Sequence, residues 1–175
     1  MRAAVVSALL FATVVWAEER VPDALGLMVM LKIVSYDTAF PSHGAGEFVV
    51  LVPYAPGAES AAAALATVGS GLEVKTIKER ALRFTPVALA ELSAKKGSAV
   101  LLVSGSSPEV LKVTLEKARA EKLYVLTYEE SAVKEGALLG VGLANGKPQP
   151  LINVAAMRAV GADFGPVLRL ARTFQ

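Results

Sequence analysis

Apolar residues in this chain come in short runs separated by polar or alanine-rich segments. Short runs with few charges are typical of strands that are buried on both faces of a sheet, and they occur at 47–54, 98–105 and 123–129. Segment 72–79 instead alternates apolar and polar residues, which predicts a half-buried edge strand. Two further strands are expected within 137–156, joined by an Asn-Gly-Lys-Pro turn.

The segments between these strands carry helix signals. Segment 23–35 follows a proline and is apolar on nearly all faces, which predicts a buried helix. Segment 85–97 begins with Thr-Pro and ends with Gly, residues that favour the two ends of a helix, and a helix is predicted there. Other helices are expected at 59–69, 107–122, 130–135 and 165–174, and 37–46 is expected to be a loop.

Strands that alternate with helices predict right-handed βαβ units and a parallel sheet. The fold class expected is therefore α/β, a three-layer sandwich. Its sheet would be mostly parallel, with about five or six strands and a C-terminal antiparallel hairpin. A chain of 175 residues favours a single domain.

The first residues have the layout of a cleavable secretory signal. Arg2 precedes the apolar run 3–15, and Ala17 is followed by two glutamates. A membrane anchor is the alternative, but the run is shorter than the roughly 20 residues of a spanning helix. We therefore expect a signal peptide over 1–17 and a mature domain over 18–175, located in the periplasm.

Composition narrows the function classes. The mature chain would carry 17 basic and 16 acidic residues, a net charge of +1, so no strong field favours nucleic acid. The chain has no cysteine, which excludes disulfides and thiolate chemistry. With 54% hydrophobic residues, the mature chain can bury a core.

The carboxyl ends of the predicted strands are where ligands bind in open α/β sheets. The candidate ligand-binding residues at these ends are Tyr54, Ser104, Ser106, Ser107 and Tyr128. Serine hydroxyls and backbone N–H groups at the start of a helix suit an anion. The alternative is that Ser106 or Ser107 simply caps the helix that follows.

Catalytic patterns are missing. The sequence contains no dinucleotide fingerprint, no P-loop and no nucleophile elbow. His43 is its single histidine, which makes a transition-metal site improbable and leaves a catalytic triad without support. We expect His43 to be a solvated loop residue. The residues thus predict no catalytic residue, no metal and no cofactor, and indicate an exported binding or regulatory module.

The end of the chain resembles the C-terminal signature of the YfiR family of exported proteins. An apolar strand with Asn153 leads through two alanines to Gly161, then to Phe164 and a segment with Leu168 and Leu170. We expect Asn153 to bond a loop backbone, Gly161 to allow a turn, and Phe164, Leu168 and Leu170 to close the core. The chain departs from the family in lacking cysteine pairs and an aromatic-proline end to its first helix.

The resemblance implies a periplasmic regulator that binds the periplasmic part of an inner-membrane diguanylate cyclase, or of a sensor kinase, and modulates cyclic di-GMP output. Tyr36, Asp37 and Phe40, at the end of the first predicted helix, are the candidate partner-binding residues. The competing interpretation is that this helix simply packs on the sheet. The second hypothesis is a small-molecule-binding module similar to one lobe of a periplasmic solute-binding protein. A homodimer is a possible assembly of such a module. A hydrolase is the third.

Overall fold

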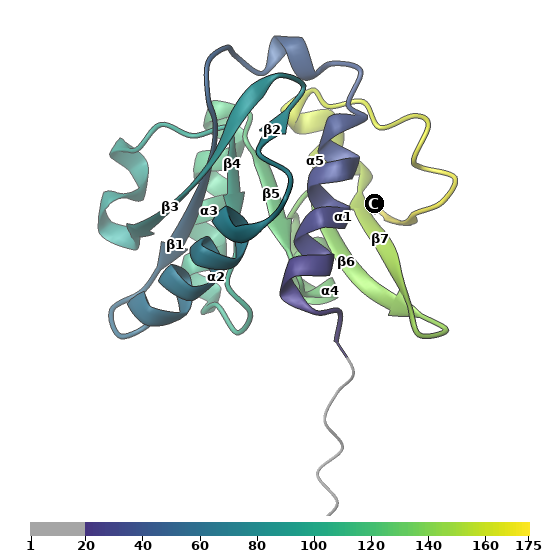
Figure 1. The fold of residues 1–175 in the computed structure, drawn as a ribbon. Coiled ribbons are helices and arrows are strands. Elements are labelled where there is room, and N and C mark those ends of the chain that lie inside the picture. The colour runs from purple at the N-terminus through teal and green to yellow at the C-terminus, as the bar shows by residue number, and fades with distance from the viewer. Residues whose placement is uncertain (1–19) are drawn as a thin grey trace, which may run out of the picture.

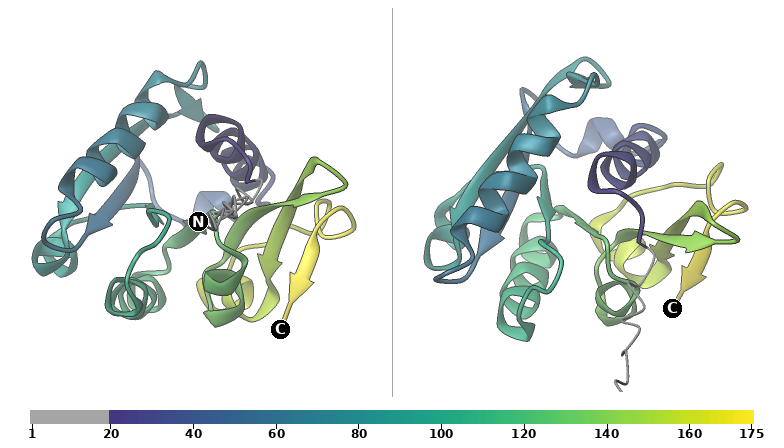
Figure 2. Two further views of the ribbon diagram at one scale, coloured as in Figure 1. Left: turned by 90° about the horizontal axis from the view of Figure 1, so that it is seen from below. Right: turned by 60° about the horizontal axis from the view of Figure 1, so that its bottom comes forward.

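The computed structural model of this protein describes residues 20–175, and an eight-stranded sheet forms the middle of that part. The proposed signal peptide, 1–17, lies outside the described residues. The predicted fold class is confirmed: the sheet is mostly parallel and helices cover both of its faces (Figures 1 and 2). The expected number of strands, five or six, was too low because β3 (Arg80–Ala88) and the short edge strand β8 (Arg172–Phe174) were not foreseen.

The strand order is β2-β3-β1-β4-β5-β6-β7-β8. Five neighbouring strands pair in parallel: β3 (Arg80–Ala88), β1 (Phe48–Tyr54), β4 (Ala99–Leu101), β5 (Tyr124–Thr127) and β6 (Leu139–Ala144). The expected C-terminal hairpin pairs β6 with β7 (Lys147–Asn153). The edges are β2 (Thr76–Ile77), antiparallel to β3, and β8 (Arg172–Phe174), parallel to β7.

Helices α1 (Asp23–Ser35) and α2 (Glu59–Gly71) lie on one face of the sheet. The other face carries α3 (Pro108–Glu121), α4 (Glu130–Glu135), α5 (Val154–Val160) and the 3-10 helix η2 (Leu89–Ala94) (Figure 2). A second 3-10 helix, η1 (Phe40–Ser42), follows α1. Two apolar cores result, one under α1 and α2 and one under α3.

The helix predicted over 85–97 was wrong. Residues through Ala88 continue β3, which pairs with β1 along its whole length, and only the short η2 follows. Pro86 has no N–H to donate, yet it fits because β2 pairs only with Arg80 and Ala81 and leaves β3 open beyond them. Parallel pairing therefore outweighed a local helix signal.

The predicted helix over 165–174 was also wrong, and the strand over 72–79 is shorter than expected. Residues 165–170 form turns, and the chain then adds β8 to the sheet beside β7. Strand β2 has two residues and ends in a tight turn, where Lys78 and Glu79 have positive φ angles of 44° and 70°.

Candidate functional site

The sequence of α1 has almost no polar face, yet the structure leaves one side of the helix uncovered. Its only polar residues are Asp23, Lys32 and Ser35. A helix that is apolar all round is normally buried on all sides. Here one stripe stays open to solvent, with Leu25 39%, Met28 40% and, just after the helix, Tyr36 47% exposed.

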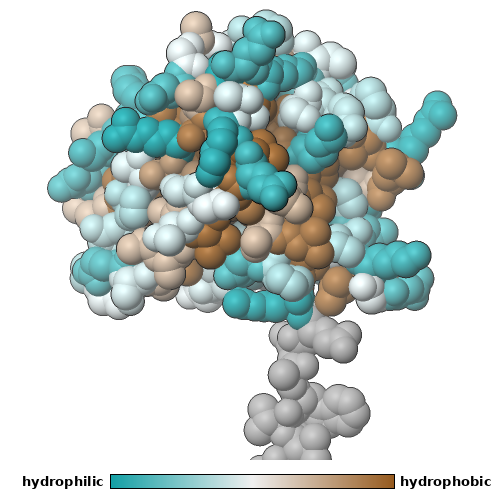
Figure 3. Space-filling model, in the orientation of Figure 1, coloured by the Kyte–Doolittle hydropathy of each residue, from teal (hydrophilic) through white to brown (hydrophobic). Residues whose placement is uncertain are grey.

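This stripe forms the floor of a groove of about 600 Å³, called here the α1 groove. In Figure 1 the β2 hairpin lies on one side of α1 and the C-terminal segment on the other. Both contribute apolar side chains, and Figure 3 shows hydrophobic residues gathered on the face that carries α1. Besides residues of α1, the lining includes Val74, Thr76, Ile77, Lys78, Pro150, Val167 and Leu170.

Two tyrosines from one strand hold α1 against the sheet. Tyr128, just after β5, donates its hydroxyl to the carbonyl of Asp23 at the start of α1 (2.9 Å). Tyr124, at the start of β5, donates its hydroxyl to Asp37 Oδ2 just beyond the end of α1 (2.6 Å). Both ends of α1 are thus fixed to the sheet, which keeps the exposed stripe facing outward.

Gly26 allows α1 to approach the sheet closely. A Cβ atom at this position would lie 2.8 Å from a ring carbon of Tyr128 and 2.8 Å from Val141 Cγ1. No Cβ atom tolerates such contacts without a shift of its neighbours. The glycine in the middle of this helix is therefore explained by packing.

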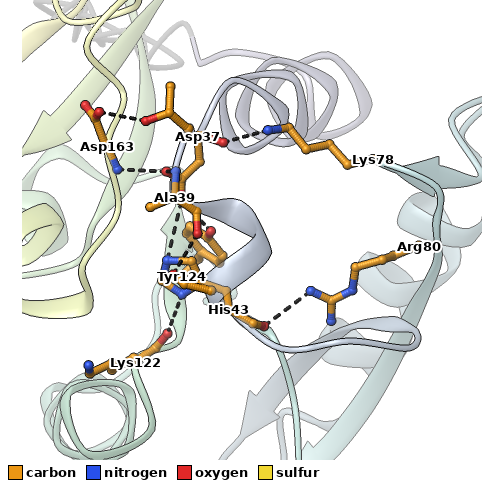
Figure 4. Close-up of polar contacts among 10 residues, drawn as sticks. Asp37, Ala39, His43, Lys78, Arg80, Lys122, Tyr124 and Asp163 are labelled. Atoms are coloured by element: carbon orange, nitrogen blue, oxygen red, sulfur yellow. Dashed lines mark hydrogen bonds and ion pairs between the residues drawn. The ribbon is translucent and has the colours of Figure 1, made fainter.

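Asp37 lies at the centre of a buried polar cluster, shown in Figure 4. Its Oδ1 accepts hydrogen bonds from the backbone N–H groups of Ala39 and Asp163, each 2.8 Å long. Its Oδ2 accepts from Tyr124 and lies 3.5 Å from His43 Nε2. One carboxylate therefore joins η1, β5 and the C-terminal segment. We call Asp37, Ala39, His43, Tyr124 and Asp163 together the Asp37 cluster.

The Asp37 cluster also positions both walls of the α1 groove. Lys78, in the β2 hairpin, donates to the backbone carbonyl of Asp37 (2.7 Å). On the other side Thr38 and Asp163 are linked by a backbone bond of 3.0 Å and a side-chain bond of 2.7 Å. Val167 and Leu170, which line the groove, follow Asp163 in the chain.

Burial raises the pKa of both tyrosines well above the ordinary value for a phenol. For Tyr124 the hydrogen bond to Asp37 and its negative charge add to the effect of burial on the pKa. For Tyr128 the pKa is raised by burial first and by the Asp23 charge second. Both hydroxyls therefore stay protonated and act as donors at ordinary pH.

Asp37 and Phe40 were wrongly placed on a partner-binding surface. Asp37 is 0% exposed and Phe40 is 3% exposed, so neither offers a surface to a partner. Of the three predicted residues only Tyr36 is exposed and lines the α1 groove. His43 was also wrongly expected to be solvated: its side chain is 4% exposed and packs on Tyr124, with ring centroids 4.7 Å apart.

The carboxyl ends of the strands form a second candidate site, a cleft of about 500 Å³ with a mixed polar and apolar lining, called here the strand-end cleft. Ser104 and Tyr128 both line it, together with Arg20, Glu129 and Glu130. A smaller pocket of about 290 Å³, between this cleft and α2, shares Arg20, Ser104 and Tyr128. The structure thus brings two of the five predicted ligand-binding residues together.

The other three lie elsewhere. Tyr54 is half-buried and packs against the core under α1 and α2. Ser107 Oγ accepts from the Val110 N–H (3.4 Å) and caps α3, as the alternative interpretation predicted. Ser106 donates to the Val103 carbonyl (2.6 Å).

A carboxylate of the protein itself already accepts a hydrogen bond from a backbone N–H group at the carboxyl ends of the strands. The N–H of Gly105 is bonded by the Glu129 side chain. A negative charge at that place opposes the anion that the serine-rich turn suggested.

The residues of the C-terminal signature are largely structural. Asn153 bonds backbone groups of two helices, accepting from Ala156 N and donating to the Val133 carbonyl, each at 2.8 Å. Gly161 ends α5 with φ of 79°, a left-handed value that favours glycine. Phe164 is fully buried and Leu168 packs on the same core, but Leu170 is 74% exposed, so its predicted core role was wrong.

Within residues 20–175 no group of three or more His, Cys, Asp or Glu side chains is arranged to hold a metal ion. None of the helices in that range is long and apolar enough to cross a bilayer.

No protein-family model matches this sequence, and no curated protein is significantly similar to it. Solved structures do share the fold. One is described as an ABC domain from Streptococcus pneumonia in complex with L-Trp (TM-score 0.56, 12% identity). Another is described as a conserved domain protein from Vibrio cholerae (TM-score 0.59, 15% identity). Each match covers 88% of this chain but only 60% of the other protein, and identities this low establish the fold alone.

Proposed function

We propose that this protein is an exported regulatory binding protein, similar to the YfiR family, that docks on a membrane signalling protein and restrains it. Its partner would be the periplasmic part of an inner-membrane diguanylate cyclase or sensor kinase. The observation that carries the proposal is the uncovered apolar stripe of α1, with Leu25, Met28 and Tyr36 exposed side by side.

A stripe of this kind is costly to leave in water. Each Å² of apolar surface removed from water contributes about 25 cal/mol, and contiguous apolar patches on soluble domains commonly mark interaction sites. The groove is lined almost entirely by apolar side chains, whereas the lining of the strand-end cleft mixes serine, glutamate and arginine with apolar residues. A protein partner therefore suits the α1 groove better than a small polar ligand does.

The fixed position of α1 supports a regulatory role. Tyr124 and Tyr128 hold its two ends, and the Asp37 cluster holds the walls of the groove. A preformed binding surface loses little conformational entropy on docking. Such a surface can shift a two-state receptor by binding one of its states more tightly than the other.

The sequence adds two independent supports. The signal-like residues 1–17 favour export of the mature chain to the periplasm, where the sensor parts of inner-membrane proteins are accessible. The C-terminal run from Asn153 to Leu170 resembles the signature of a family with this function.

Deletion of the gene in its own organism tests the proposal. Cyclic di-GMP measured by mass spectrometry is expected to rise in the deletion strain and to return to the parental level on complementation. A tagged copy should capture an inner-membrane cyclase or kinase from solubilised envelopes. Unchanged cyclic di-GMP, together with no such capture, would refute the proposed function.

The strand-end cleft favours a second function, the binding of a small molecule. Ser104, Tyr128 and Arg20 line both of its pockets, and a protein of the same fold is described in complex with L-Trp. Isothermal calorimetry with a panel of amino acids tests this function. Binding that is lost in Ser104→Ala but kept in Ser107→Ala would support it, and absence of heat with every amino acid would count against it.

A further inference from the structure

We propose that the α1 groove receives an amphipathic helix of the partner whose apolar face is flanked by carboxylates. This inference rests on the proposed function and deepens it by naming the chemistry of the docking segment.

The shape of the groove suits a helix. The exposed residues of the stripe, from Leu25 through Met28 and Lys32 to Tyr36, follow the i, i+3, i+7 and i+11 spacing of one helix face. At 1.5 Å per residue this stripe is about 16 Å long, or about three turns of a partner helix. Docking of an amphipathic helix into an apolar groove uses anchors at the same spacing.

The walls of the groove argue against a membrane surface as its occupant. The β2 hairpin contributes Val74 and Ile77 on one side of α1, and the C-terminal segment contributes Val167 and Leu170. A hollow between two walls admits a narrow rod, whereas peripheral membrane helices present their apolar face outward to the lipid.

The charges at the groove have one sign. Within residues 20–175, Lys32 and Lys78 are the charged residues that line it, and no carboxylate of that range does. The Lys32 ammonium lies 5.1 Å from the Tyr36 ring centroid. Lys78 uses one hydrogen bond on the Asp37 carbonyl, which leaves further N–H donors of its ammonium for a partner. An incoming carboxylate on the flank of the helix would pair with these amines.

The same charges argue against a second copy of this chain. A symmetric contact between two grooves would bring the Lys32 and Lys78 side chains of both copies to one interface. Like charges that face each other across an interface disfavour the pairing. A heterologous partner that carries acidic residues avoids this repulsion.

Photocrosslinking in intact envelopes tests the inference. The full-length gene is expressed with p-benzoylphenylalanine in place of Met28, and a matched control carries it in place of Leu143, which is 36% exposed and lines the strand-end cleft, away from the groove. The crosslinked peptide is identified by mass spectrometry. We expect this peptide to carry apolar residues at helical spacing, with Asp or Glu within one turn of them. It should be crosslinked to position 28 and not to position 143.

A second measurement uses the unmodified protein and two 18-residue probe peptides. Both carry leucine at positions i, i+3, i+4 and i+7, and one has glutamates on the flanks where the other has lysines. Fluorescence polarisation should show about tenfold tighter binding of the glutamate peptide, equivalent to about 1.4 kcal/mol. Lys32→Glu should abolish this preference, whereas Lys147→Glu, at a lysine outside the lining, should keep it.

The outcomes separate the two proposals. An acidic amphipathic segment from a protein that is neither a cyclase nor a kinase would sustain this inference and refute the proposed function. A crosslink to a cyclase through a segment without carboxylates would do the opposite. A crosslink to lipid or to a second copy, no crosslink at position 28, or equal affinity for the two peptides would overturn the inference.

Discussion

Replacement of Asp37 by alanine is expected to destabilise the protein strongly. The carboxylate is fully buried and accepts hydrogen bonds from the Tyr124 hydroxyl and from the backbone N–H groups of Ala39 and Asp163. Alanine would leave all three donors without their acceptor in the interior. The variant also removes the negative charge 3.5 Å from His43 Nε2.

The size of the effect follows from these contacts. An unpaired buried polar group costs about 1–3 kcal/mol, and removal of one member of a buried charged network costs about 3–5 kcal/mol. We therefore expect Asp37→Ala to lower the free energy of unfolding by about 3–5 kcal/mol. Asp37→Asn keeps an oxygen for the two backbone donors and should cost about 1–2 kcal/mol.

Urea unfolding followed by far-UV circular dichroism measures both variants. A double-mutant cycle with Tyr124→Phe isolates the Tyr124–Asp37 hydrogen bond, whose coupling energy should be about 1.5–3 kcal/mol because the acceptor is charged. A loss below about 1 kcal/mol for Asp37→Ala, or additive effects in the cycle, would refute the role assigned to Asp37.

Three further predictions concern the packing around α1. Because Tyr124 and Tyr128 are neutral in the fold but ionise near pH 10 when unfolded, stability should fall above that pH by about 1.4 kcal/mol per unit for each. The double phenylalanine variant, titrated in parallel, should lose this slope. Phe164→Ala should cost about 3–5 kcal/mol and Leu170→Ala less than about 0.5 kcal/mol in urea unfolding, and equal losses would contradict the burial pattern. Gly26→Ala should lower the melting temperature despite the higher helix propensity of alanine, because its methyl group meets the Tyr128 ring; a rise would show that α1 is less tightly packed than described.

Much of the fold could be predicted from the sequence because each buried strand is a short apolar run bounded by turn residues. The strands at 47–54 and 123–129 and the helix at 23–35 follow from such patterns, and so does the hairpin of β6 and β7. The errors arose where long-range pairing decides the structure. Thr85 and Pro86 read as a helix start, but β1 offers a full-length parallel partner to β3.

The candidate site was harder to predict, because its main features depend on which surfaces remain uncovered. The apolar character of α1 was visible in the sequence, but not that Leu25 and Met28 would stay exposed. Local sequence also gave no sign that His43 and Asp37, from one loop, would be buried against Tyr124.

A comparison of two variants shows whether the α1 groove is the docking surface. Tagged wild-type protein, Met28→Asp and Leu143→Asp are used to capture partners from the same solubilised envelopes, with quantitative mass spectrometry as the readout. Both substitutions place a charge at an exposed apolar position, but only Met28 lines the groove. If the α1 groove is the docking surface, Met28→Asp lowers capture of the membrane signalling protein at least about tenfold, while Leu143→Asp captures it as the wild type does. Equal capture by all three proteins, or a loss confined to Leu143→Asp, would contradict it.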